Sequence, residues 1–163
     1  MGEAMVTVDR VRGKRLLGID FGLRRIGWAV CDELHLSVTP GGVLSYHSPQ
    51  FWDELERVIQ TQRVEGIVVG MPVGSESPQG VFVIHQLREF VRQLRRRFVQ
   101  PVYVYDETGS TRRAQESLRL LGIPRKRRQQ KGYTDRIAAA LILWDFLQEL
   151  HTWGVVRQEQ LEE

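Results

Sequence analysis

One aspartate inside an apolar segment is the residue whose placement most directly suggests chemistry. Asp20 ends the apolar segment 16–20, and Gly18 and Gly22 lie two residues to either side of it. A carboxylate among apolar neighbours costs several kcal/mol unless it is paired or binds a cation. Because glycine has no Cβ, a phosphate or another stretch of backbone can come close there. The pattern suits a divalent cation that faces a phosphate.

Two further carboxylates are expected at the same edge of a sheet. Glu107 follows a short apolar segment, and Asp135 stands at the start of a predicted helix. Ligands of open α/β sheets bind beyond the carboxyl ends of strands, and a helix N-terminus tolerates a carboxylate. Three carboxylates with few histidines favour Mg²⁺ or Mn²⁺ over zinc, and such ions support phosphodiester hydrolysis. From the residues alone, Asp135 could instead cap its helix, and Glu107 or Asp106 could pair with a nearby arginine.

Basic residues gather in two clusters of a chain whose net charge is +3. Arg95–Arg97 fit the polar end of a helix, for which a solvated surface is the simpler interpretation. The second cluster precedes Asp135 and suits a phosphate backbone. Its members are Arg125, Lys126, Arg127, Arg128 and Lys131. The other candidate nucleic-acid contacts are Arg24, Arg25 and Arg136, which neighbour the acidic residues.

Hydrophobic periodicity predicts the elements that would position these residues. A hairpin of strands at 15–20 and 26–31 is followed by a turn at Pro40-Gly41-Gly42 and a third strand from Val43. Helices are predicted near 50–63, 83–98, 114–121 and 137–147, with strands at 66–70 and 101–105. This order predicts an α/β fold with a mixed sheet flanked by helices.

The length of 163 residues fits one domain. We expect this domain to span 15–150, between a loose tail over 1–14 and a polar tail over 151–163. The sequence has no apolar segment long enough to cross a membrane and no signal-peptide core, so we expect a cytoplasmic protein without membrane contact. The single cysteine, Cys31, rules out an internal disulfide and is expected to be buried and inert.

Four blocks of the sequence resemble the YqgF family of RNase H-like nucleases, also described as Holliday junction resolvase-like proteins and pre-16S rRNA nucleases. The resemblance implies an RNase H-like mixed five-stranded sheet flanked by helices, with Asp20, Glu107 and Asp135 as metal-binding catalytic acids. Thr108 stands where the family usually has arginine, and Arg136 where it often has a small or acidic residue. The blocks are Gly18-Ile19-Asp20-Phe21-Gly22 with Arg25-Ile26-Gly27, Val68-Val69-Gly70-Met71-Pro72, Asp106-Glu107 with Ser110-Thr111, and Asp135 with Ala138-Ala139.

Four functions are compatible with these features. The leading one is a metal-dependent nuclease that hydrolyses phosphodiester bonds of structured nucleic acid, RNA rather than DNA, in pre-16S ribosomal RNA processing. The second is a Holliday junction resolvase acting on DNA, which should be a homodimer with two sites. The third is a catalytically silent RNase H-like module that binds nucleic acid, and the three acids count against it. The fourth, an actin-type or sugar-kinase ATPase, would need two such domains.

Overall fold

A mixed five-stranded sheet forms the centre of the computed structural model, which describes residues 5–71, 78–106, 133–159 and 161. The strand order is β4-β3-β2-β5-β6. β2 pairs antiparallel with β3 and parallel with β5, β4 joins β3 antiparallel, and β6 joins β5 in parallel. The strands are β2 (Leu16–Asp20), β3 (Arg25–Cys31), β4 (Val38–Ser45), β5 (Gly66–Met71) and β6 (Val102–Asp106).

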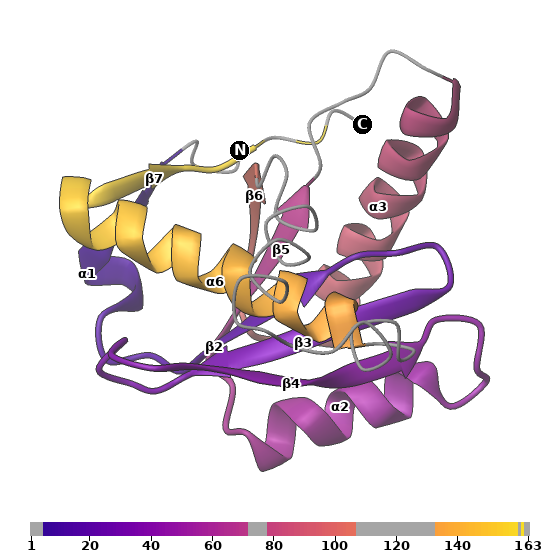
Figure 1. Cartoon of the computed structure of the whole chain (residues 1–163), viewed down its shortest axis with the longest axis horizontal. Coiled ribbons are helices and arrows are strands. Elements are labelled where there is room, and N and C mark those ends of the chain that lie inside the picture. Colours follow the sequence, from indigo (N-terminus) through magenta and orange to yellow (C-terminus); the bar gives the residue numbers. More distant parts are fainter. Residues whose placement is uncertain (1–4, 72–77, 107–132, 160, 162–163) are drawn as a thin grey trace, which may run out of the picture.

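Helices cover both faces of this sheet (Figure 1). On one face, α2 (Phe51–Thr61) and α3 (Pro78–Arg97) share a core with alternate residues of the strands, including Leu17 and Ile19. On the other face, α6 (Tyr133–Trp153) packs against Leu16 and its neighbours. These elements confirm the predicted mixed sheet with helices on its faces. The helix predicted at 114–121 lies outside the described residues.

The predicted turn at Pro40-Gly41-Gly42 is wrong, because these residues lie inside β4. Gly42 pairs with Trp28 and Pro40 with Ala29, so Gly41 is an extra residue in the ladder, a β-bulge. A Cβ on Gly41 would overlap the Trp28 ring. The glycine therefore makes room for an aromatic side chain of the neighbouring strand and does not reverse the chain.

The two segments expected to be tails are also more ordered than predicted. β1 (Met5–Thr7) leads into α1 (Val8–Val11) and pairs antiparallel with β7 (Val155–Arg157). Val6 and Val156 are buried in the core beneath α6. Isolated strands of three residues carry too few positions to show a periodicity, and these two come from opposite ends of the chain. The domain boundaries at 15 and 150 stay a prediction.

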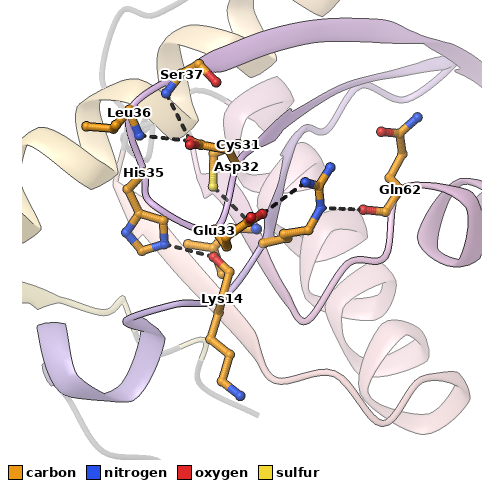
Figure 2. A network of polar contacts seen from close by, with 10 residues as sticks. Lys14, Cys31, Asp32, Glu33, His35, Leu36, Ser37 and Gln62 are labelled. Atoms are coloured by element: carbon orange, nitrogen blue, oxygen red, sulfur yellow. Dashed lines mark hydrogen bonds and ion pairs between the residues drawn. The ribbon is translucent and has the colours of Figure 1, made fainter.

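Polar contacts fix the end of the sheet opposite Asp20 (Figure 2). Asp32 Oδ1 accepts hydrogen bonds from the backbone N–H of Leu36 and Ser37, at 2.8 and 3.0 Å. The Ser37 bond is the main reason why the pKa of the Asp32 carboxyl lies below its ordinary value. Cys31 is buried as expected, and burial raises the pKa of its thiol to about 11, so the thiolate is scarce at neutral pH.

Two histidines connect this end of the sheet to the end of α6. His35 Nε2 lies 2.8 Å from the carbonyl oxygen of Lys14, which can only accept, so this nitrogen donates (Figure 2). In the neutral ring Nδ1 must then accept, and it lies 2.9 Å from Nε2 of His151. Burial lowers the pKa of His151, and the nearby His35 and Arg12 lower it further.

In the described parts of the chain, no helix combines the length and apolar character needed to cross a bilayer.

Candidate nucleic-acid cleavage site

Asp20 lies where the sequence predicted it, at the carboxyl end of a central strand. It is half-buried, and it pairs with Gly27 of β3 and Gly70 of β5. Directly paired residues project to the same face of a sheet. The space beside Gly27 is filled by the first turn of α6. The Asp20 side chain therefore projects from the α6 face, beside the start of that helix.

Two glycines let α6 approach the sheet this closely. A Cβ on Gly18 would lie 2.8 Å from Leu143 Cβ and 2.9 Å from the carbonyl oxygen of Ala139. A Cβ on Gly27 would lie 2.5 Å from the carbonyl carbon of Asp135 and closer still to its oxygen. Glycines around Asp20 were expected to admit a phosphate or another stretch of backbone. At these two positions the group admitted is the chain's own helix.

Asp135 is the acidic residue of the first turn of α6. Arg25 Nε lies 3.2 Å from Asp135 Oδ2, at ion-pair distance. The same Oδ2 is buried, and it accepts no well-aligned hydrogen bond from the described residues. Arg25 Nε and Asp135 Oδ2 are close enough for an ion pair, but the Nε–H bond does not point at the oxygen, so the contact is not a hydrogen bond. This carboxylate oxygen thus keeps a lone pair for a further ligand.

A cavity of about 980 Å³ opens beside this pair. Arg24 and Arg25 line it, so two of the predicted phosphate contacts lie next to Asp135. Ser45 and His47 also line it, and sequence reasoning did not find them. The register that pairs Arg25 with Ser45 brings this end of β4 to the site. The remaining described lining residues are Gly22, Leu23 and Val43.

Asp106 is the first of the two acidic residues that follow Tyr105, and it lies on the wrong face of the sheet to join Asp20. Val102 and Val104 belong to the core under α2 and α3, whereas Tyr103 and Tyr105 pack on the α6 side. Asp106 pairs with Met71, which also packs against the α2 and α3 core. The alternation therefore puts Asp106 on the face opposite Asp20.

Several predicted site residues lie outside the described residues, so the structure brings together only part of the expected set. Arg136 follows Asp135 on α6 and is half-buried. Within the described ranges, no three His, Cys, Asp or Glu side chains form a group that could hold a metal ion. The predicted residues outside these ranges are Glu107, Arg125, Lys126, Arg127, Arg128 and Lys131.

Comparison with known proteins gives one family and one fold. The model of the RuvX family, described as Holliday junction resolvase, matches residues 14–149. A Syntrophus aciditrophicus protein named "Putative pre-16S rRNA nuclease" is 36% identical over 137 residues, covering 82% of this chain and 87% of its own. A Chlorobium luteolum protein of the same name is 37% identical over 136 residues, covering 83% of this chain and 94% of its own.

Among solved structures, that of Thermus thermophilus RuvC in complex with Holliday junction substrate is similar to this chain, with a TM-score of 0.56 and 19% identity. The match covers 90% of this chain and 99% of RuvC. At this identity the likeness concerns the fold, and it confirms the expected RNase H-like architecture. The family match confirms the resemblance stated from the sequence blocks.

Proposed function

Because the chain belongs to the RuvX family of Holliday junction resolvases, we propose that it is a divalent-metal-dependent nuclease acting on structured nucleic acid. Pre-16S ribosomal RNA is the substrate that we place first, because relatives at 36% and 37% identity carry that name. The reaction is hydrolysis of a phosphodiester bond in the cytoplasm.

The observation that carries the proposal is the meeting of Asp20, Asp135 and two arginines at one edge of the sheet. Asp20 ends β2 on the α6 face, and α6 begins there with Asp135. Arg24 and Arg25 line the adjoining cavity. Carboxylate oxygens are the ligands that Mg²⁺ and Mn²⁺ prefer, and the buried Oδ2 of Asp135 fits such an ion. Guanidinium groups beside them suit a phosphodiester.

We assign metal ligation to Asp20, Asp135 and Glu107. Asp106 faces away from Asp20, so Glu107 is the better third ligand of the adjacent pair. A Mg²⁺ or Mn²⁺ ion held by these residues would supply Lewis-acid chemistry, which would activate a water molecule and stabilise the leaving oxygen. Arg25 neutralises Asp135 in the protein alone, and we propose that it turns to the substrate phosphate when a cation takes over that role.

A second candidate substrate is a four-way DNA junction. The family description and the fold shared with junction-bound RuvC favour it. A resolvase should act as a homodimer with two sites, whereas processing of an RNA end needs one. Cleavage products and oligomeric state therefore separate the two candidates.

The test is cleavage of a matched panel by wild type and Asp20→Asn, each with Mg²⁺ or Mn²⁺. The panel holds precursor 16S rRNA, single-stranded RNA and a four-way DNA junction. We expect the precursor to be cleaved by wild type and not by the variant, which keeps the shape of the carboxylate but loses its charge. Wild-type turnover by a correctly folded Asp20→Asn protein would refute the metal-nuclease proposal.

The third ligand is tested in the same assay by separate alanine variants of Glu107 and Asp106. We expect the larger rate loss at Glu107. Titration of each protein with Mn²⁺, followed by electron paramagnetic resonance, gives a readout that does not depend on turnover. A larger loss of rate and of Mn²⁺ affinity at Asp106 would show that the wrong residue has been assigned.

A further inference from the structure

Four arginines of α3 line a cavity of about 220 Å³ on the side of the sheet opposite α6. Val91 of the same helix and Leu161 from the end of the chain complete its described lining. The four arginines follow one another at spacings of four, three and one, which places them along one face of the helix. They are Arg88, Arg92, Arg95 and Arg96, and we call them the arginine stripe.

A solvated helix end explains only part of the stripe. Arg95 and Arg96 stand in the last turn of α3, where a positive charge is favourable beside the helix C-terminus. Arg88 and Arg92 lie further back, where this effect has faded. Like charges four residues apart destabilise a helix by about 0.2–0.5 kcal/mol per pair, and Arg88, Arg92 and Arg96 form two such pairs. This arrangement calls for a negatively charged partner.

The described surroundings supply little negative charge. Glu89 is the only acidic residue of α3, and it forms an exposed ion pair with Arg92 at 2.8 Å. Exposed pairs of this kind contribute little. The Nε of Arg88 is buried and has no hydrogen-bond acceptor among the described residues. Among the described residues, and with Glu159 of the C-terminal segment included, two negative charges accompany the four positive ones.

Segments from distant parts of the sequence hold the stripe in place. Arg95 donates to the carbonyl oxygen of Val102 at 3.0 Å and to Gln158 Oε1 at 3.4 Å. Gln158 Oε1 also accepts from the backbone N–H of Val104, and Glu159 N–H donates to Val104 O. The C-terminal segment is thus tied to β6, the last strand of the five-stranded sheet. Arg95 is thus anchored, whereas Arg92 is held only by its exposed ion pair with Glu89.

The stripe runs along α3 toward the same end of the strands at which Asp20 lies, on the opposite face of the sheet. Because α3 connects two parallel strands, it runs back from the carboxyl end of β5 to the beginning of β6 (Figure 1). Arg95 and Arg96 are therefore near the start of β6. Arg88 is about 10 Å closer to the carboxyl edge, at 1.5 Å of helix per residue. Asp20 lies at that same edge.

We propose that the arginine stripe is a second phosphate-binding surface, which holds the backbone of a nucleic-acid strand outside the cleavage site. This rests on the proposed function only in taking the nucleic acid as the polyanion. Guanidinium groups bind phosphate oxygens through paired N–H donors. Contacts to phosphates carry no sequence information, so the surface adds affinity and orientation for long substrates of any sequence.

The test compares two charge-matched triple variants in EDTA, so that no cleavage occurs. The first is Arg88→Gln, Arg92→Gln and Arg96→Gln. The control is Arg10→Gln, Arg12→Gln and Arg57→Gln, which removes equal charge from exposed positions away from the stripe. The probe is a fluorescein-labelled long single-stranded RNA of mixed sequence, whose anisotropy is followed over a range of salt concentrations.

For the stripe variant, we expect the slope of log affinity against log salt to flatten by about 2, because each phosphate that is no longer neutralised removes about 0.7. If the affinity extrapolated to 1 M salt is unchanged, the loss at about 0.1 M is on the order of 100-fold. Equal slopes for the stripe variant and the control would overturn the proposal. Loss of binding to a polyglutamate peptide, with RNA binding intact, would overturn it in favour of an acidic protein partner.

Arg88 is half-buried, so its replacement also calls for a check of thermal stability. If the triple variant unfolds, the double variant Arg92→Gln, Arg96→Gln tests the same idea with an expected flattening of about 1.4. The outcome is independent of the proposed function. A stripe-dependent salt slope in a protein that cleaves nothing in the substrate panel would refute the nuclease proposal and leave the phosphate surface standing. Cleavage by a protein whose salt slope does not depend on the stripe would refute the phosphate surface and leave the nuclease proposal standing.

Discussion

Replacing Gly27 with alanine should displace Asp135 while leaving every carboxylate in the protein. The new methyl group would lie 2.5 Å from the carbonyl carbon of Asp135, whereas ordinary contact begins at 3.4 Å. The obstacle is backbone at the start of a helix, which cannot turn aside as a flexible side chain would. The first turn of α6 must therefore move by roughly 1 Å, since Gly27 itself is held between two strands.

Both stability and rate should respond to this shift. Overpacking of this kind costs about 1–3 kcal/mol, and in a domain of this size each kcal/mol lowers Tm by about 2–4 °C. A misplacement of about 1 Å in a catalytic group can cost about 100-fold in rate. We expect Gly27→Ala to fold, to melt earlier, and to cleave its substrate roughly 100-fold more slowly at temperatures well below Tm.

Gly18→Ala is the matched control. Its methyl group would meet the same helix further along, at Leu143 Cβ and the Ala139 carbonyl. It should therefore lower Tm by a comparable amount with a smaller loss of rate. Differential scanning fluorimetry and single-turnover cleavage on both variants provide the comparison. This expectation is refuted if both variants lose rate in proportion to their loss of stability, or if Gly27→Ala cleaves like wild type. Either result would show that Gly27 does not fix the position of Asp135.

Two further predictions concern the basic cluster that precedes Asp135 and the histidine pair. Changing its four consecutive cations to glutamine should weaken RNA binding alike for all sequences, with little change in Tm, and should flatten the slope of log affinity against log salt by about 0.7–0.9 for each phosphate that is no longer neutralised; an unchanged slope would show that the cluster does not contact the substrate. Those cations are Arg125, Lys126, Arg127 and Arg128. Because the pKa of His151 is lowered in the folded protein, the unfolded chain binds the proton more readily, so stability should fall as pH drops below the ordinary value of 6.5. Tm measured against pH should fall less steeply for His151→Gln, and parallel curves would contradict the assignment.

The sheet was predictable because its strands are short apolar segments bounded by glycine. Leu16–Asp20 and Gly66–Met71 carry this pattern in the sequence itself. β4 was cut short in the prediction, since Pro40-Gly41-Gly42 has the composition of a turn. What keeps Gly41 in a strand is the Trp28 ring beside it, and that neighbour is known only once the strands are paired.

In the site, too, residues were predicted where their own segment of sequence identifies them, and missed where only the pairing of strands brings them in. Asp20 stands out because its own segment is apolar, and Arg25 lies close to it in the sequence. Ser45 and His47 reach the cavity only through the pairing of β3 with β4. The arginines at the end of α3 were interpreted as solvated surface. Their contacts with Gln158 and Leu161 could not be predicted, since these residues come from the far end of the chain.

The position of Asp135 depends on the whole length of α6 as well as on its first turn. Beneath the helix, Leu143 and Leu150 are fully buried in the core that also holds Val156 of β7. At its last turn, His151 meets His35. These contacts hold the later turns of α6 against the sheet, whereas the Gly27 contact holds its first turn, so changes in them should lower the catalytic rate less than Gly27→Ala does. The arginine stripe belongs to α3 on the opposite face, so its loss should change affinity for long substrates and leave the rate of the bound complex as it was.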